Sequence, residues 1–114
     1  MNDKDAELLR IVDTAISCCA SDLTGELSIT REDVIGKSRA ENIVLTRTIL
    51  VAQIIAAGYS TTTAAKLLQR DVHSIRYLMQ LNNRLLKSSR AYRIAAAEVE
   101  RKCKSETNQK APSN

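Results

Sequence analysis

The sequence predicts an all-α protein of about six helices, and three observations support this fold class. Only 3 glycines and 1 proline occur among the 114 residues, too few for the many turns of a β-sandwich or a β-barrel. Apolar residues recur at three- and four-residue spacing, which is the period of an amphipathic helix, and no segment is convincing as a strand. The length suits one domain with a modest core.

Two helices are predicted near the start of the chain. Residues 5–20 have the apolar spacing of an amphipathic helix, and residues 21–29 are expected to form a loop. Thr30 can cap a short second helix, in which Asp33 stands at the position that completes a capping box. Gly36 is expected to end that helix.

A long helix is predicted over residues 40–57, and Gly58 is expected to end it. The stretch 49–57 is apolar almost all round, which indicates a central, buried helix. Arg47 is the only charged residue between Glu41 and Lys66. We expect its side chain either to extend along its methylene stem to the surface or to project from a rim toward an anionic ligand.

The most informative segment is a predicted pair of helices, residues 61–68 and 72–87, joined by a turn at residues 69–71. A close crossing of two such helices needs a small residue on the first helix, and Ala65 meets this need. It also needs apolar residues at the contact, and three occur at the spacing of a helix-turn-helix: Leu68, Ile75 and Leu78. Gln69 stands where a glycine is often found, and a generic helical hairpin would give a similar pattern.

The end of the chain is expected to hold one more helix and a tail. Ser88 and Ser89 can cap a last helix over residues 90–104. Residues 105–114 contain no large apolar residue and are expected to form a disordered tail. The chain therefore divides into one helical domain, residues 1–104, and this tail.

The formal net charge of +4 conceals a strong asymmetry along the chain. Residues 1–30 carry two basic and six acidic side chains, whereas residues 66–104 carry ten basic and three acidic ones. A basic second half is typical of a surface that binds a polyanion. A helix face that contacts only solvent gives the same pattern, so charge alone leaves both interpretations open.

The composition argues against metal binding, disulfides and membrane insertion. One histidine and three cysteines (Cys18, Cys19 and Cys103) lack metal-ligand spacing, and an odd cysteine count makes a poor disulfide framework. Free thiols fit a reducing cytoplasm. No apolar run reaches the roughly 20 residues of a membrane helix, and the N-terminus lacks the features of a signal peptide. We therefore expect a cytoplasmic protein that does not enter a membrane.

Catalysis and nucleotide binding are not expected either. The pattern places no Ser/His/Asp set or carboxylate pair together in a pocket, so we do not expect an enzyme. The chain lacks the Gly-rich loop with Lys-Ser/Thr that cradles nucleotide phosphates. No cofactor is therefore expected.

Two segments carry a family resemblance. In residues 29–55, ITREDVIGKSRAENIVLTRTILVAQII, a short helix precedes a Lys-x-Arg loop (Lys37 and Arg39) and then an Ile-Val-x-x-Arg pattern that ends at Arg47. Residues 70–75 are RDVHSI. In these features the chain resembles the C-terminal DNA-binding domain of the bacterial replication initiator DnaA, whose fold is similar to that of the Trp repressor and whose signature is Arg-Asp-His-Thr-Thr-Val. The resemblance covers about residues 11–104.

The resemblance implies a Trp-repressor-like DNA-binding domain without the initiator's ATPase. It implies that Arg47 contacts the minor groove or the DNA backbone. It also implies that Asp71 and Ser74, together with His73, contact DNA from the recognition helix. Val72 stands where the family has histidine, and His73 and Ser74 stand where it has threonine.

The residue types of the second helix of the pair add further candidates. Arg76 projects from its first turns and is the best candidate for a base or phosphate contact. Asp71 also suits the N-cap, His73 could be a surface histidine, and Tyr77 could be a core aromatic with its hydroxyl at the rim. The full set of expected DNA-binding residues is Lys37, Arg39, Arg47, Thr61, Arg70, Asp71, His73, Ser74, Arg76 and Tyr77.

The sequence thus predicts a sequence-specific double-stranded DNA-binding protein that regulates replication or transcription. The recognition helix, residues 72–87, is expected to enter the major groove, while Arg47 and the loop at residues 37–39 hold the adjacent backbone and minor groove. The alternative is a helical interaction adaptor that kept the fold and lost DNA binding. The oligomeric state is left open.

Overall fold

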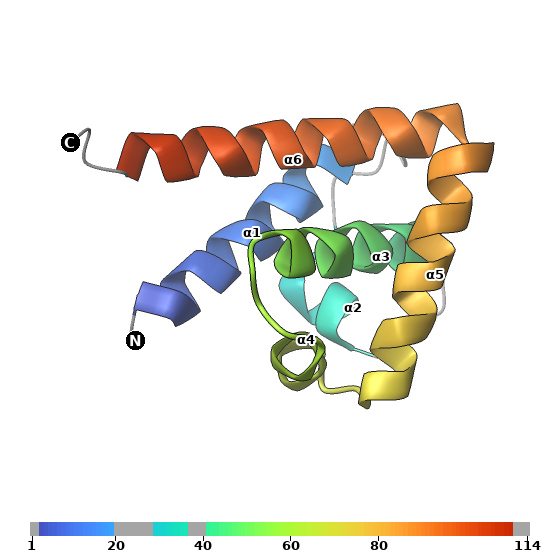
Figure 1. The fold of residues 1–114 in the computed structure, drawn as a ribbon, viewed down its shortest axis with the longest axis horizontal. Coiled ribbons are helices and arrows are strands. Elements are labelled where there is room, and N and C mark those ends of the chain that lie inside the picture. The colour runs from blue at the N-terminus through green and yellow to red at the C-terminus, as the bar shows by residue number, and fades with distance from the viewer. Residues whose placement is uncertain (1–2, 20–28, 37–40, 111–114) are drawn as a thin grey trace.

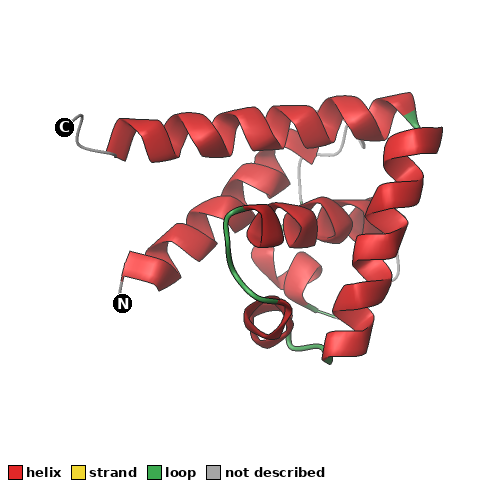
Figure 2. Ribbon diagram, in the orientation of Figure 1, coloured by secondary structure: helices red, strands yellow, loops and turns green. Residues whose placement is uncertain are grey.

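The computed structural model describes residues 3–19, 29–36 and 41–110, with side chains over residues 5–19, 29–36 and 43–104. Within these ranges the chain forms six helices and no strand, which confirms the all-α class (Figures 1 and 2). The helices are α1 (Asp3–Cys19), α2 (Arg31–Ile35), α3 (Glu41–Ala56), α4 (Thr61–Leu68), α5 (Val72–Ser88) and α6 (Arg90–Lys110). None of the described helices is both long enough and apolar enough to span a membrane.

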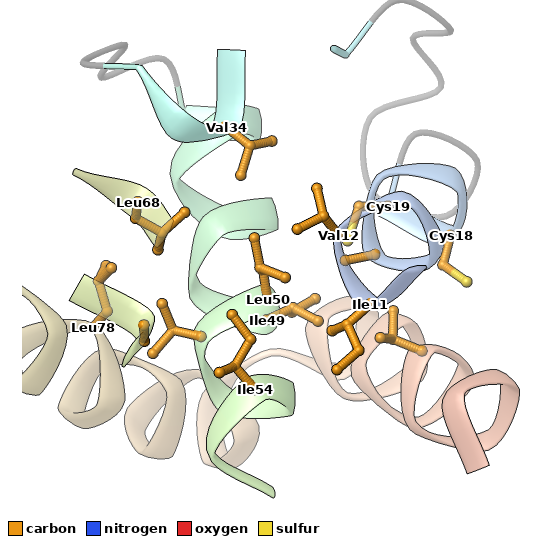
Figure 3. Close-up of a cluster of buried hydrophobic side chains, with 14 of the residues drawn as sticks. Ile11, Val12, Cys18, Cys19, Val34, Ile49, Leu50, Ile54, Leu68 and Leu78 are labelled. Carbon is orange, nitrogen blue, oxygen red and sulfur yellow. The ribbon is translucent and has the colours of Figure 1, made fainter. Parts of the chain in front are cut away.

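Helix α3 is the centre of the fold. It contacts each of the five other helices, and α5 crosses one end of it while α6 runs along the top of the view in Figure 1. Leu50 and Ile54 of α3 are fully buried, as the apolar run predicts. In Figure 3 the α3 side chains lie between Val12 of α1 on one side and Leu68 of α4 on the other.

Local sequence signals set the ends of α2. The Thr30 hydroxyl accepts a hydrogen bond from the Asp33 backbone N–H at 3.1 Å, and the Asp33 carboxylate accepts one from the Thr30 N–H at 3.0 Å. These two bonds form the predicted capping box. Gly36 ends the helix as predicted, with an ordinary φ of −73°. A Cβ there would lie 2.7 Å from the Glu32 carbonyl oxygen, so the close approach of the backbone requires glycine.

The ends of α1 and α3 also lie close to their predicted positions. Helix α1 covers most of the predicted residues 5–20, and the predicted loop falls almost entirely on residues 20–28, which lie outside the described residues. Helix α3 ends at Ala56, and Gly58 follows with φ +103°, a conformation that suits glycine. The Tyr59 hydroxyl then donates a hydrogen bond to the Glu7 carboxylate, which ties the chain after α3 to α1.

Helices α4 and α5 form the close pair that the sequence predicts. The Ser60 hydroxyl caps α4 by accepting from the Thr63 N–H at 3.1 Å. Gln69 ends α4 in the left-handed region, with φ 55° and ψ 46°, where a glycine is more usual. The four residues predicted at the crossing are all buried: Ala65, Leu68, Ile75 and Leu78.

The turn from α5 into α6 is fixed by polar contacts. The Ser89 hydroxyl accepts from the Tyr92 N–H at 3.1 Å, as a cap should. The Tyr92 hydroxyl donates to the Asn82 Oδ1 at 2.7 Å inside the core. Helix α6 is longer than predicted, because its backbone stays helical to Lys110 instead of ending at Lys104, and residues 111–114 of the expected tail lie outside the described residues.

Candidate nucleic-acid interface

The outer side of α5 is a continuous exposed surface. Helix α5 packs against α3, α4 and α6 through its apolar side, on which Ile75, Leu78 and Asn82 are buried. On the opposite side, exposed residues recur every three or four positions. We call these seven residues the α5 face: His73, Arg76, Tyr77, Gln80, Asn83, Arg84 and Lys87.

The α5 face carries positive charge that no described carboxylate neutralises. The sequence from Val72 to Ala97 contains no aspartate or glutamate. Among the described residues, no carboxylate pairs with Arg76, Arg84 or Lys87. A row of exposed cations with amide and aromatic side chains between them is the chemistry that binds phosphates and base edges.

Asp71 stands at the N-terminal end of this face as the N-cap of α5. Its carboxylate accepts a hydrogen bond from the Ser74 backbone N–H at 2.8 Å. The hydrogen bonds from the backbone and side chain of Ser74 hold the pKa of Asp71 below its ordinary value. One carboxylate oxygen is thus committed to the cap, and the side chain is nevertheless exposed.

Tyr77 and His73 are surface residues. Tyr77 is 55% exposed, so its ring is not part of the core. His73 is exposed one turn earlier on the same side of the helix. Ser74 is half-buried, and its backbone N–H is used by the cap.

Arg47 is not where either sequence interpretation puts it. Its side chain is 3% exposed, so it neither reaches the surface nor projects toward a ligand, and the expectation that it projects from a rim is wrong. Its guanidinium donates to backbone carbonyls instead, from Nε to Val34 at 2.7 Å and from Nη2 to Asp33 at 3.2 Å and Gly36 at 3.1 Å. Burial, and then the nearby Arg70, lower the pKa of Arg47.

The hydrogen bonds from Arg47 to the end of α2 follow from the shortness of α2. The last carbonyls of a helix have no partner within the helix, and a five-residue helix has few other bonds to hold it. A guanidinium carries five N–H donors and a positive charge that suits the C-terminal end of a helix. Arg47 therefore acts as a cap for α2 that is supplied by another helix.

Arg70 lies beside Arg47 and is half-buried. Its Nη2 donates to the Gly36 carbonyl at 2.5 Å, so that one oxygen accepts from both arginines. Its Nε is buried and has no hydrogen-bond partner among the described residues. Its own backbone N–H donates to the Ala65 carbonyl at 2.9 Å. Arg70 thus joins the end of α4 to the end of α2.

The remaining predicted DNA contacts differ in whether the structure describes them and in how exposed they are. Lys37 and Arg39 lie outside the described residues. Thr61 is the first residue of α4 and is half-buried. Arg76, the strongest candidate from the sequence, is exposed on the α5 face beside His73 and Tyr77, so these three are brought together.

Four residues of the α5 face are absent from the expected set, namely Gln80, Asn83, Arg84 and Lys87. Gln80 and Asn83 are exposed on the same side of α5 as Arg76, and both are amides that can pair with a base edge. Continuing the three- and four-residue spacing beyond Tyr77 would have identified them, since both keep the period of the face.

The basic start of α6 extends the charged surface only in part. Arg90 is exposed, and no described carboxylate pairs with it. Arg93 has a structural partner, because its Nη1 donates to the Leu86 carbonyl at 2.9 Å and to the Lys87 carbonyl at 3.4 Å. It caps the C-terminal end of α5 in the way that Arg47 caps α2.

No other kind of site stands out in the described part of the chain. It holds no group of three histidine, cysteine or carboxylate side chains that could bind a metal ion. Cys18, Cys19 and Cys103 are buried and form no disulfide among the described residues. Comparison of the chain with protein-family models, with curated proteins and with solved structures found no match.

Proposed function

We propose that the protein binds double-stranded DNA through a helix-turn-helix formed by α4 and α5. The single observation that carries the proposal is the α5 face, an exposed and cationic side of a helix whose other side is packed on the core. An α-helix fits the major groove, which is about 12 Å wide. In this arrangement α4 crosses the backbone and the α5 face meets the base edges.

The charges on α5 divide the face into two parts. Its first turns present His73, Arg76, Tyr77 and Gln80, residues with the donors and acceptors that discriminate base pairs. Its last turns and the corner with α6 present three exposed cations that can contact phosphates, namely Arg84, Lys87 and Arg90. The first part is proposed to supply sequence preference, and the second to supply most of the affinity.

The buried position of Arg47 changes the proposed interface. A side chain that is 3% exposed and bonded to three carbonyls does not reach the minor groove without unfolding its own surroundings. The proposed contacts therefore come from the α5 face and its corner with α6. Regulation of replication or transcription in the cytoplasm is the role that such a protein would serve.

Fluorescence anisotropy on a labelled duplex tests the proposal. The wild-type protein should bind a random-sequence duplex at low salt, and selection from a random duplex pool should enrich one sequence. Arg76→Ala should weaken binding to the selected sequence by about 1–3 kcal/mol and relax the preference at one position.

Arg101→Ala is the matched control, because it removes the same charge from an exposed arginine of α6 that is paired with Glu98. It should change the affinity much less than Arg76→Ala does. No binding by the wild type at low salt, with purified protein free of nucleic acid and indifferent to heparin, would refute DNA binding and favour the interaction adaptor.

A further inference from the structure

We propose that Arg47 and Arg70 are positioning residues that lock the end of α2 to the start of α5, so that Arg47 governs DNA recognition without touching DNA. The lock is a property of the free protein. Only its consequence for recognition rests on the proposed function.

The lock depends on the Gly36 carbonyl oxygen, which accepts hydrogen bonds from both arginines. The Gly36 carbonyl accepts from Arg47 at 3.1 Å and from Arg70 at 2.5 Å, although these two arginines are far apart in the sequence. Arg47 makes two more bonds, to the Val34 and Asp33 carbonyls, so it holds the whole last turn of α2. The end of α2 is thus bonded to α3 and to the α4–α5 connection at once.

Arg70 carries this constraint to the recognition helix. It immediately precedes Asp71, the N-cap of α5, whose carboxylate accepts from the Ser74 N–H. The Arg70 backbone is held by the Ala65 carbonyl and its side chain by Gly36. The first turn of α5, where the proposed base contacts begin, is therefore tied through one residue to α2.

The arrangement is costly for a simple cap. Two guanidinium groups that share an acceptor repel each other, and the buried Arg70 Nε has no partner in the described part of the chain. One neutral donor set would satisfy the carbonyls of α2 without this repulsion. The two arginines instead share one acceptor, the Gly36 carbonyl, and so connect α3 and the α4–α5 connection through the end of α2. A shared acceptor of this kind is expected where the relative positions of these segments must be fixed.

Amide spectra of the free protein test the lock directly. Arg47→Met keeps the length of the side chain and removes its donors, and it should shift the ¹⁵N–¹H resonances of residues 71–75. Arg93→Met is the matched control, since Arg93 bonds carbonyls at the opposite end of α5. It should shift resonances near residues 86–89 and leave residues 71–75 in place.

A folded Arg47→Met protein with unmoved resonances at residues 71–75 would overturn the lock. Should Arg47→Met fail to fold, Arg70→Met tests the same link from its other end. It should shift the resonances of residues 33–36, and unmoved resonances there would be equally decisive against it.

DNA binding supplies the second readout. Arg47→Met should reduce the ratio of the affinity for the selected duplex to the affinity for a random duplex by about tenfold. A reduction of this size is expected for the loss of about one base contact. The salt dependence of Arg47→Met should equal that of the wild type, whereas loss of a phosphate contact lowers the slope by about 0.9. A lower slope in Arg47→Met would mean a direct phosphate contact and would overturn the proposal.

Arg47→Lys separates positioning from charge, because it keeps the charge and loses the fork of donors. It should recover only part of the lost preference. A wild-type protein that binds no DNA would refute the proposed function alone, since the amide spectra would still decide whether the lock exists.

Discussion

The affinity for duplex DNA should fall steeply with salt, and the steepness follows from four exposed cations. Arg76, Arg84, Lys87 and Arg90 are exposed on the α5 face and its corner with α6. Each neutralised phosphate contributes about −0.9 to the slope of log affinity against log salt. Counting the charge of Arg76 together with the three proposed phosphate contacts gives a slope of about −3.6. Affinity should then fall about 150-fold between roughly 50 and 200 mM salt.

The perturbation is replacement by glutamine of the three cations proposed to contact only phosphate, Arg84, Lys87 and Arg90. Glutamine keeps a polar, helix-compatible side chain and removes the charge. If only the Arg76 contact remains, the slope becomes about −0.9 and the loss over the same salt range falls to about 3- to 4-fold. Anisotropy titrations at four salt concentrations measure both slopes.

The control removes three positive charges from the other part of α6, where each is paired with Glu98 or Glu100: Arg101, Lys102 and Lys104. This triple variant has the same net charge as the first and should keep a slope within about 1 of the wild type. Equal loss of slope in the two triple variants would refute the argument, because net charge rather than the α5 face would then determine binding. A wild-type slope near zero would refute it more simply.

Three further predictions concern stability. Gln69→Gly should raise the free energy of unfolding by about 0.5–1 kcal/mol in urea denaturation, because φ 55° is disfavoured for glutamine; Gln69→Val should lower it. Burial and the hydrogen bond to Glu7 raise the pKa of Tyr59 from 10.0 to about 12, so this group favours folding below pH 10 and loses that effect as the pH rises to about 12. Tyr59→Phe should therefore flatten the decline of the urea midpoint over this range, and an unchanged decline would contradict the assignment. Tyr92→Phe should cost about 1–3 kcal/mol in urea denaturation, because Asn82 Oδ1 is left buried without its donor; a cost near zero would mean that another donor replaces it.

The helices and most of their ends were predictable because their causes are local, although the predicted end of α6 at Lys104 was wrong. The capping box of Thr30 and Asp33 needs only two residues three positions apart, and it forms as predicted. Gly58 ends α3 with a positive φ for a reason that lies within one residue. The exposed row on α5 is likewise a matter of helical period, so Arg76 could be placed on the surface before the fold was known.

The position of Arg47 was not predictable in the same way. An isolated arginine on an apolar helix signals that its charge needs a partner, and the sequence shows this signal clearly. The partners are backbone carbonyls of α2, which carry no side-chain signature at all. Residue types reveal where a donor is, but an acceptor on the main chain is revealed only by the tertiary fold. The family resemblance implied a DNA contact for Arg47, whereas its guanidinium donates to backbone carbonyls of α2.

The same reasoning limits what the basic second half of the chain can contribute to DNA binding. Of its ten cations, two donate to helix-end carbonyls and three pair with glutamates on α6, and these five are Arg70, Arg93, Arg101, Lys102 and Lys104. The other five are exposed, and four of them lie on the α5 face or at its corner with α6. A charge count over residues 66–104 therefore exceeds the four cations proposed to contact DNA about 2.5-fold. The cations without a described partner are concentrated on one helix, and this concentration, rather than the net charge, favours a DNA groove as the partner.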